Sequence, residues 1–218
     1  DKSSYDAEIR NLASLGFVAV SIQYRLAPKH IFPAQVEDAK CAVRFLRANA
    51  KKYNINPGSI GALGDSAGGH LALMLGLMNT EDGLEGDGGS NAFTSKIQAV
   101  VNYYGPTDFN QKEVWSEAQI AQAGYFFGTE APDLELIKKA SPAAYIDPKD
   151  PPILTVHGTA DPIVPVTQAT HLHQLLKVAG VQSQLDIVQG AGHGWQSPDQ
   201  DRIQTQTIQF FKTHLSNK

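Results

Sequence analysis

The residues best suited to chemistry in this sequence lie at positions 64–68 (GDSAG), where a serine stands between two glycines. The apolar run before it, residues 60–63, predicts the end of a buried strand, and the run 68–78 predicts a buried helix. A sharp turn between them would expose the Ser66 hydroxyl at an unfavourable backbone angle. It would also direct the Ala67 N–H at a reacting centre. Alone, the pattern can also occur by chance in an ordinary turn.

Two residues far along the chain could activate this serine. Asp161 follows a strand predicted at 153–157, and His193 lies in a glycine-rich loop after a strand predicted at 184–188. A serine hydroxyl is a weak nucleophile, so it needs an imidazole to accept its proton and a carboxylate to hold that imidazole. We therefore expect Ser66 to be the nucleophile, His193 the base and Asp161 the acid. The alternatives are a turn serine, a loop histidine and a capping carboxylate.

The elements that must position these residues alternate along the chain. Helical patterns separate the apolar runs, so the sequence predicts an α/β protein, a mostly parallel sheet with right-handed crossovers. Helices predicted at 33–53, 167–179 and 199–215 would cover both faces of that sheet. The strands are predicted at residues 17–22, 60–63, 99–104, 153–157 and 184–188.

The order of serine, aspartate and histidine, each after a strand, is that of an α/β-hydrolase. The chain resembles esterases of that superfamily over most of its length, closest to the feruloyl-esterase-like and carboxylesterase branch near the hormone-sensitive-lipase group. Pro162 and the three residues after it stand where the hormone-sensitive-lipase group has a second acidic residue, which favours the feruloyl-esterase-like side. The resemblance implies the α/β-hydrolase fold, the roles given above for Ser66, Asp161 and His193, and an oxyanion donor at Ala67. The matching motifs are residues 24–28 (YRLAP), 32–34 (FPA), 37–38 (ED), 64–70 (GDSAGGH), 141–142 (SP), 157–161 (HGTAD) and 164–165 (VP).

One element of that family is absent from this sequence. Family members carry a His-Gly-Gly element upstream of the helix that corresponds here to residues 3–14, and it supplies the second oxyanion donor. Asp1, Lys2 and Ser3 resemble the segment that follows this element, so we expect a chain without the first strands of the fold. Loss of one donor costs about a hundred- to a thousand-fold in turnover. A truncated chain or unrecorded upstream residues are favoured over a natural short form with another donor.

Length and composition fit a single domain, residues 1–218, with 42% hydrophobic and 18% charged residues. A net charge of -4 without a basic run argues against nucleic acid and anionic membranes as partners. No apolar stretch approaches the roughly 18 residues of a membrane span. The single cysteine, Cys41, excludes an intrachain disulfide. Oligomeric state and location, cytoplasmic or secreted, stay open.

Two segments interrupt the alternation of strands and helices. Residues 81–91 are rich in glycine and acid and predict an exposed loop, whose spacing does not match a calcium-binding EF-hand. Residues 107–150 predict a small lid, whose aromatic residues could line a pocket or simply pack together. Candidate pocket residues are Asp65, Phe109, Val164 and Trp195. No histidine, cysteine and carboxylate cluster has zinc-ligand spacing, so we expect neither metal nor cofactor.

The expected reaction is hydrolysis of a small-molecule ester through an acyl-enzyme. The family resemblance and the modest lid favour short acyl esters, such as acetates or butyrates on plant cell-wall sugars, or hydroxycinnamates. One alternative is a serine peptidase of the prolyl-oligopeptidase type, although the chain has no room for that family's propeller domain. The other is a ligand-binding protein on the same scaffold, which the presence of His193 disfavours.

Overall fold

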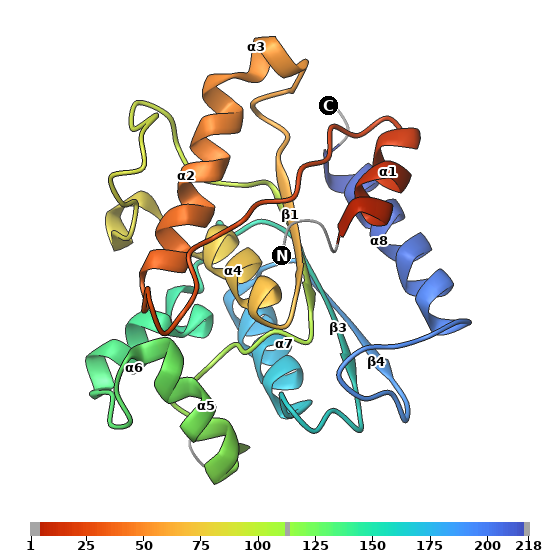
Figure 1. Ribbon diagram of the computed structural model, residues 1–218. Helices are drawn as coiled ribbons and strands as arrows, with labels where there is room; N and C mark the ends of the chain where they lie inside the picture. Colours follow the sequence, from red (N-terminus) through yellow and green to blue (C-terminus); the bar gives the residue numbers. More distant parts are fainter. Residues whose placement is uncertain (1–4, 112–113, 216–218) are drawn as a thin grey trace.

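The computed structural model describes residues 5–111 and 114–215. Its described residues form one sheet of four parallel strands in the order β1-β2-β3-β4 (Figure 1). Each strand pairs with the next one in the chain, so every connection crosses a face of the sheet. The predicted parallel α/β class is confirmed. The strands are β1 (Gly61–Asp65), β2 (Ala99–Tyr103), β3 (Ile153–Gly158) and β4 (Ser183–Val188).

Helices cover both faces of this sheet (Figure 1). Successive residues of β2 point to opposite faces, so Val100 packs in one apolar cluster and Val101 in the other. The helices predicted at 167–179 and 199–215 form as predicted, and the one predicted at 33–53 is divided at Asn49. One face carries α2 (Ala34–Ala48), α4 (Ala67–Leu77) and α7 (Thr167–Ala179), and the other α1 (Asp6–Ser14) and α8 (Asp199–Leu215), while α3 (Ala50–Tyr53) continues from α2.

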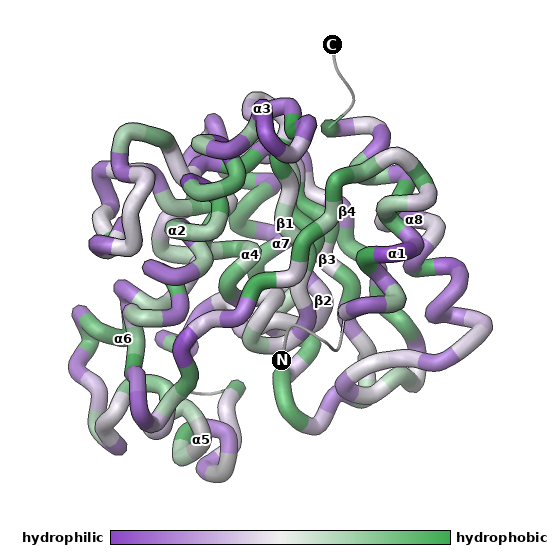
Figure 2. Tube along the Cα trace, turned by 45° about the horizontal axis from the view of Figure 1, so that its top comes forward, coloured by the Kyte–Doolittle hydropathy of each residue, from purple (hydrophilic) through white to green (hydrophobic). Residues whose placement is uncertain are grey.

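The strand predicted at residues 17–22 does not form. This stretch runs irregularly between α1 and α2, with several hydrophobic residues along it (Figure 2). A groove of about 840 Å³ is lined by this stretch and by β1, so the two backbones do not pair. Val18 and Val20 stay 53% and 51% exposed. An apolar pattern makes a strand only where a neighbour completes the hydrogen-bond ladder, and among the described residues β1 pairs with β2 alone.

The described residues of the segment 107–150, which are 107–111 and 114–150, form a helical unit beside the start of α2 (Figure 1). It contains α5 (Glu117–Phe127), α6 (Leu134–Ala140) and the 3-10 helix η4 (Pro142–Tyr145). Its aromatic side chains pack on one another and on Phe32, and Phe127 is only 4% exposed. These aromatic side chains therefore pack both within the unit and against the segment that precedes α2.

The acidic loop predicted as exposed is partly buried. After the 3-10 helix η2 (Thr80–Asp82), the Glu85 carboxylate reaches Lys40 at 3.0 Å and Arg44 at 2.6 Å, both on α2. Those cationic side chains are only 1% and 2% exposed, so the loop covers the charged face of α2. Burial of charges in pairs leaves no trace in a hydropathy pattern, and the sequence prediction missed it.

Candidate active site

Ser66 occupies the turn between β1 and α4 with a φ of 51° and a ψ of -117°. A positive φ is uncommon for any residue with a side chain, so the predicted strained turn is present. A Cβ at Gly64 would lie 2.2 Å from the backbone of Gly68, which means that only glycine permits this close approach of strand and helix. The Ser66 N–H donates to the Tyr103 carbonyl oxygen at 2.8 Å, which fixes the turn against β2.

The three residues predicted to act together meet at the carboxyl ends of β1, β3 and β4. The His193 Nε2 lies 2.8 Å from the Ser66 Oγ, and its Nδ1 lies 2.8 Å from the Asp161 Oδ2. The Asp161 side chain has no exposed surface, and that of His193 is 17% exposed. A carboxylate only accepts, so Nδ1–H donates to Asp161 and leaves Nε2 to accept from the serine hydroxyl. The arrangement suits proton transfer from Ser66.

The Asp161 carboxylate is held by its own loop and by β3. Its Oδ1 accepts from the N–H groups of Ile163 and Val164 at 2.8 and 3.0 Å. The fully buried His157 lies with its Nε2 2.8 Å from the Val164 carbonyl oxygen and 3.3 Å from the Asp161 Oδ2. Burial lowers the pKa of His157, so the ring is neutral and donates from Nε2. In the sequence, residue 157 stood out only as the first residue of the motif 157–161.

The loops that carry Asp161 and His193 are joined directly. The Ala160 N–H donates to the Ala191 carbonyl oxygen at 2.9 Å, and the Gly190 N–H donates to the Thr159 Oγ1 at 2.8 Å. A Cβ at Gly158 would lie 2.3 Å from the same Ala191 oxygen, so this contact also requires glycine. The loops that carry Asp161 and His193 are therefore positioned as one unit.

Ala67 is the first residue of α4, where backbone N–H groups have no partner inside the helix. The positive end of the helix dipole lies there and favours negative charge. Asp65, Ser66 and Ala67 line the end of the groove next to β1. A group in that groove would therefore come close to both the nucleophile and the Ala67 N–H.

The predicted pocket residues lie in different surroundings. Asp65 lines the groove, and its carboxylate helps to raise the pKa of Tyr104. Trp195 packs edge-on against Tyr104, with ring centroids 5.0 Å apart. Val164 is only 3% exposed, and Phe109 stacks on Trp115 at 5.9 Å between centroids. Asp65 and Trp195 thus lie next to the nucleophile and the base, whereas Phe109 packs into the helical unit.

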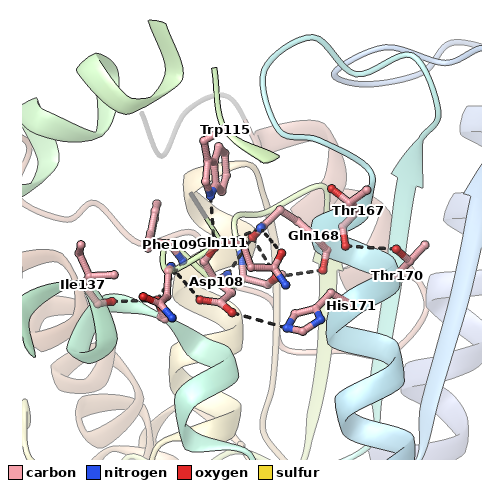
Figure 3. Close-up of polar contacts among 12 residues, drawn as sticks. Asp108, Phe109, Gln111, Trp115, Ile137, Thr167, Gln168, Thr170 and His171 are labelled. Carbon is pink, nitrogen blue, oxygen red and sulfur yellow. Dashed lines mark hydrogen bonds and ion pairs between the residues drawn. The ribbon is translucent and has the colours of Figure 1, made fainter. Parts of the chain in front are cut away.

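A buried amide fastens the start of the 107–150 unit to α7 (Figure 3). The Gln168 Oε1 accepts from the N–H groups of Thr107 and Asp108 at 2.9 and 2.8 Å. Its Nε2 donates to the Asp108 carbonyl oxygen and to Gln111, at 3.1 and 3.0 Å. Gln168 is fully buried, and His171 on the next turn pairs with Asp108 at 3.5 Å. Sequence reasoning gave no signal for this anchor, since a lone helical glutamine suggests an exposed position.

Within residues 5–111 and 114–215, no three or more histidine, cysteine or carboxylate side chains gather as they would to hold a metal ion. In the same ranges, no helix combines the length and the apolar character that a bilayer crossing requires.

Comparison with known proteins gives one family match and several esterases. The BD-FAE family model matches residues 1–176. Esterase LipC of Mycobacterium tuberculosis is 32% identical over 194 residues, which make up 87% of this chain and 48% of that protein. The chain thus spans about half the length of this curated relative.

Two solved structures share the fold over most of the chain. A truncated form of a carbohydrate esterase from gut microbiota has 31% identity and a TM-score of 0.82, covering 91% of this chain and 74% of that one. Esterase 2 of Thermogutta terrifontis, phosphonylated by sarin, has 25% identity and a TM-score of 0.86, covering 100% and 80%. Both of these structures are of proteins named as esterases.

Proposed function

Because this chain belongs to the BD-FAE family of α/β-hydrolase esterases, we propose that it hydrolyses carboxylic esters through a serine acyl-enzyme. The observation that carries the proposal is the continuous hydrogen-bonded series from Ser66 through His193 to Asp161. Esterases among the similar proteins support ester hydrolysis over peptide hydrolysis or ligand binding alone.

In the proposed reaction, the Ser66 Oγ attacks the ester carbonyl carbon while the His193 Nε2 accepts its proton. The Asp161 carboxylate stabilises the resulting imidazolium through Nδ1–H. The Ala67 N–H donates to the oxyanion. His193 then protonates the leaving alcohol, and water activated by the same nitrogen hydrolyses the acyl-enzyme.

A second oxyanion donor would have to reach the carbonyl oxygen from the groove next to β1. Ser66 and Ala67 line this groove, which supports it as the direction of approach. If the 218-residue chain acts with Ala67 as the single donor, turnover should be about a hundred- to a thousand-fold below that of a two-donor esterase.

For the substrate, we propose short acyl or hydroxycinnamoyl esters, with the 107–150 unit as a lid and with Asp65 and Trp195 bordering the reacting group. The carbohydrate esterase among the relatives supports esters on sugars. A series of 4-nitrophenyl acetate, 4-nitrophenyl butyrate, methyl ferulate and an acetylated xylo-oligosaccharide would rank the acyl groups and the alcohols. A long-chain ester hydrolysed faster than all four would contradict this proposal.

The test of the activity itself is Ser66→Ala. The variant should lose hydrolysis of 4-nitrophenyl acetate and keep its circular dichroism spectrum. Ser14→Ala, on an exposed face of α1, is the matched control and should remain active. An organophosphonate should add to the wild type at Ser66, as seen by peptide mass spectrometry. Activity retained by Ser66→Ala, or an adduct only at another residue, would refute the proposal.

A further inference from the structure

Tyr104 has a backbone conformation that its side chain disfavours. It follows β2 directly and has a φ of 42°. For a bulky residue this is a genuine outlier, and such outliers cluster at functional sites because the surrounding structure must hold them. The Tyr104 N–H donates to the Val156 carbonyl oxygen of β3 at 2.9 Å, which is one of the contacts that hold it.

The peptide unit between Tyr103 and Tyr104 also holds the turn that carries Ser66. The carbonyl oxygen of Tyr103, in the peptide bond that leads to Tyr104, accepts the Ser66 N–H at 2.8 Å. One peptide unit therefore bonds the serine turn on one side and β3, the strand that leads to Asp161, on the other. Rotation of Tyr104 to an ordinary φ would redirect this unit.

The Tyr104 side chain touches the base. Its ring centroid is 4.5 Å from that of the His193 imidazole, with 55° between the ring planes. Trp195 is the second aromatic neighbour of Tyr104, with ring centroids 5.0 Å apart. An aromatic ring within about 6 Å also attracts a cation, and the imidazole becomes cationic when it accepts the serine proton.

The Tyr104 hydroxyl interacts electrostatically with two carboxylates. Burial, with help from the Asp65 and Asp161 carboxylates, raises the pKa of Tyr104, so the hydroxyl stays protonated. Tyr104 thus contacts the His193 imidazole with its ring, and the peptide unit it shares with Tyr103 bonds the serine turn.

We propose that Tyr104 is a positioning residue, which fixes the plane of the His193 imidazole relative to Ser66. This inference rests on the proposed ester hydrolysis. A misplacement of about 1 Å can cost roughly a hundredfold in rate. Tyr104→Leu should therefore lower kcat for 4-nitrophenyl acetate by about a hundredfold, and its KM should stay near that of the wild type.

Tyr104→Phe keeps the ring contacts with His193 and Trp195 and removes only the hydroxyl, so it should restore most of kcat. Phe210→Leu removes a buried ring of α8 that does not touch the site, so it controls for lost packing and should keep kcat. If Tyr104→Leu fails to fold, Tyr104→Met gives the same comparison with a longer flexible side chain.

Proton NMR can measure the hydrogen bond between His193 and Asp161 directly, and a general loss of packing elsewhere would not change that signal. The hydrogen bond between His193 and Asp161 should give a far-downfield signal in the wild type and in Tyr104→Phe, and should broaden or shift in Tyr104→Leu. Unchanged kcat and signal in a folded Tyr104→Leu would overturn the inference, as would a loss confined to KM. An inactive wild type would instead contradict the proposed function, and the NMR comparison would still test Tyr104.

Discussion

The Nε2 of His157 lies 3.3 Å from the Oδ2 of Asp161, and neither side chain is exposed to solvent. A buried carboxylate needs its oxygens satisfied, and here backbone N–H groups, His193 and His157 surround it. The neutral His157 ring therefore helps to hold the Asp161 carboxylate in place and adds no positive charge beside it.

His157→Leu should lower both stability and kcat. The change leaves the Val164 carbonyl oxygen without its side-chain donor, which costs about 1–3 kcal/mol. His157→Gln can present an N–H at a similar place and should recover part of the loss. Urea unfolding and ester kinetics would measure both effects. His173→Leu, in the middle of α7, is the control, and the role of His157 is refuted if the two leucine variants behave alike.

Asp161→Asn should remove most activity and leave the fold. The amide can present its N–H to His193 and stabilise the wrong tautomer, and the uncharged group cannot stabilise the imidazolium. We expect kcat to fall by about 10⁴-fold with little change in KM. Steady-state kinetics check the change, and a loss of less than tenfold would argue against Asp161 as the acid.

Gly64→Ala should displace Ser66. Its Cβ would meet the Gly68 backbone at 2.2 Å, which cannot move aside as a flexible side chain would. Overpacking of this kind costs about 1–3 kcal/mol, and kcat should fall with it. Gly58→Ala is the matched control, because its Cβ would meet only Asn56 at 3.5 Å. Equal melting temperatures for the two variants would contradict the close approach.

Gln168→Leu should loosen the 107–150 unit. The change removes the buried partner of the Thr107 and Asp108 N–H groups and costs about 2 kcal/mol or more. Hydrogen exchange should rise first at residues 107–111, whereas Gln182→Leu on the surface should change nothing. If hydrogen exchange at residues 107–111 were the same in the two variants, the Gln168 amide would not be the anchor of this segment.

Stability should fall as the pH drops below neutrality because of His70. The ring is buried on α4, its Nε2 lies 2.7 Å from the Ala140 carbonyl oxygen, and burial lowers its pKa to about 4. Between the unfolded pKa of about 6.5 and this value, the unfolded chain binds more protons, so stability is lost as the pH falls. The contribution is up to about 1.4 kcal/mol per pH unit. The urea midpoints at pH 7 and pH 5 should differ less in His70→Gln than in the wild type. The same difference in both proteins would contradict the prediction.

The sequence predicted the nucleophile, base and acid because each follows a parallel strand, and the carboxyl ends of parallel strands share one edge. It could not predict Tyr104 or His157, whose roles depend on contacts between strands. Hydropathy also misled at residues 17–22, where the apolar run lacks a pairing neighbour, and on α2, where Glu85 forms ion pairs with the buried Lys40 and Arg44. The spacing of apolar residues indicates which side of an element is buried. It does not indicate which other segment covers that side.

The groove beside β1 has a consequence for handling the protein in solution. The outer side of this strand carries backbone donors and acceptors that β2 does not use, and half-exposed valines stand nearby. Such an edge is a template for intermolecular pairing. Concentrated samples of the 218-residue chain should therefore self-associate through this side of the molecule before they lose their helices.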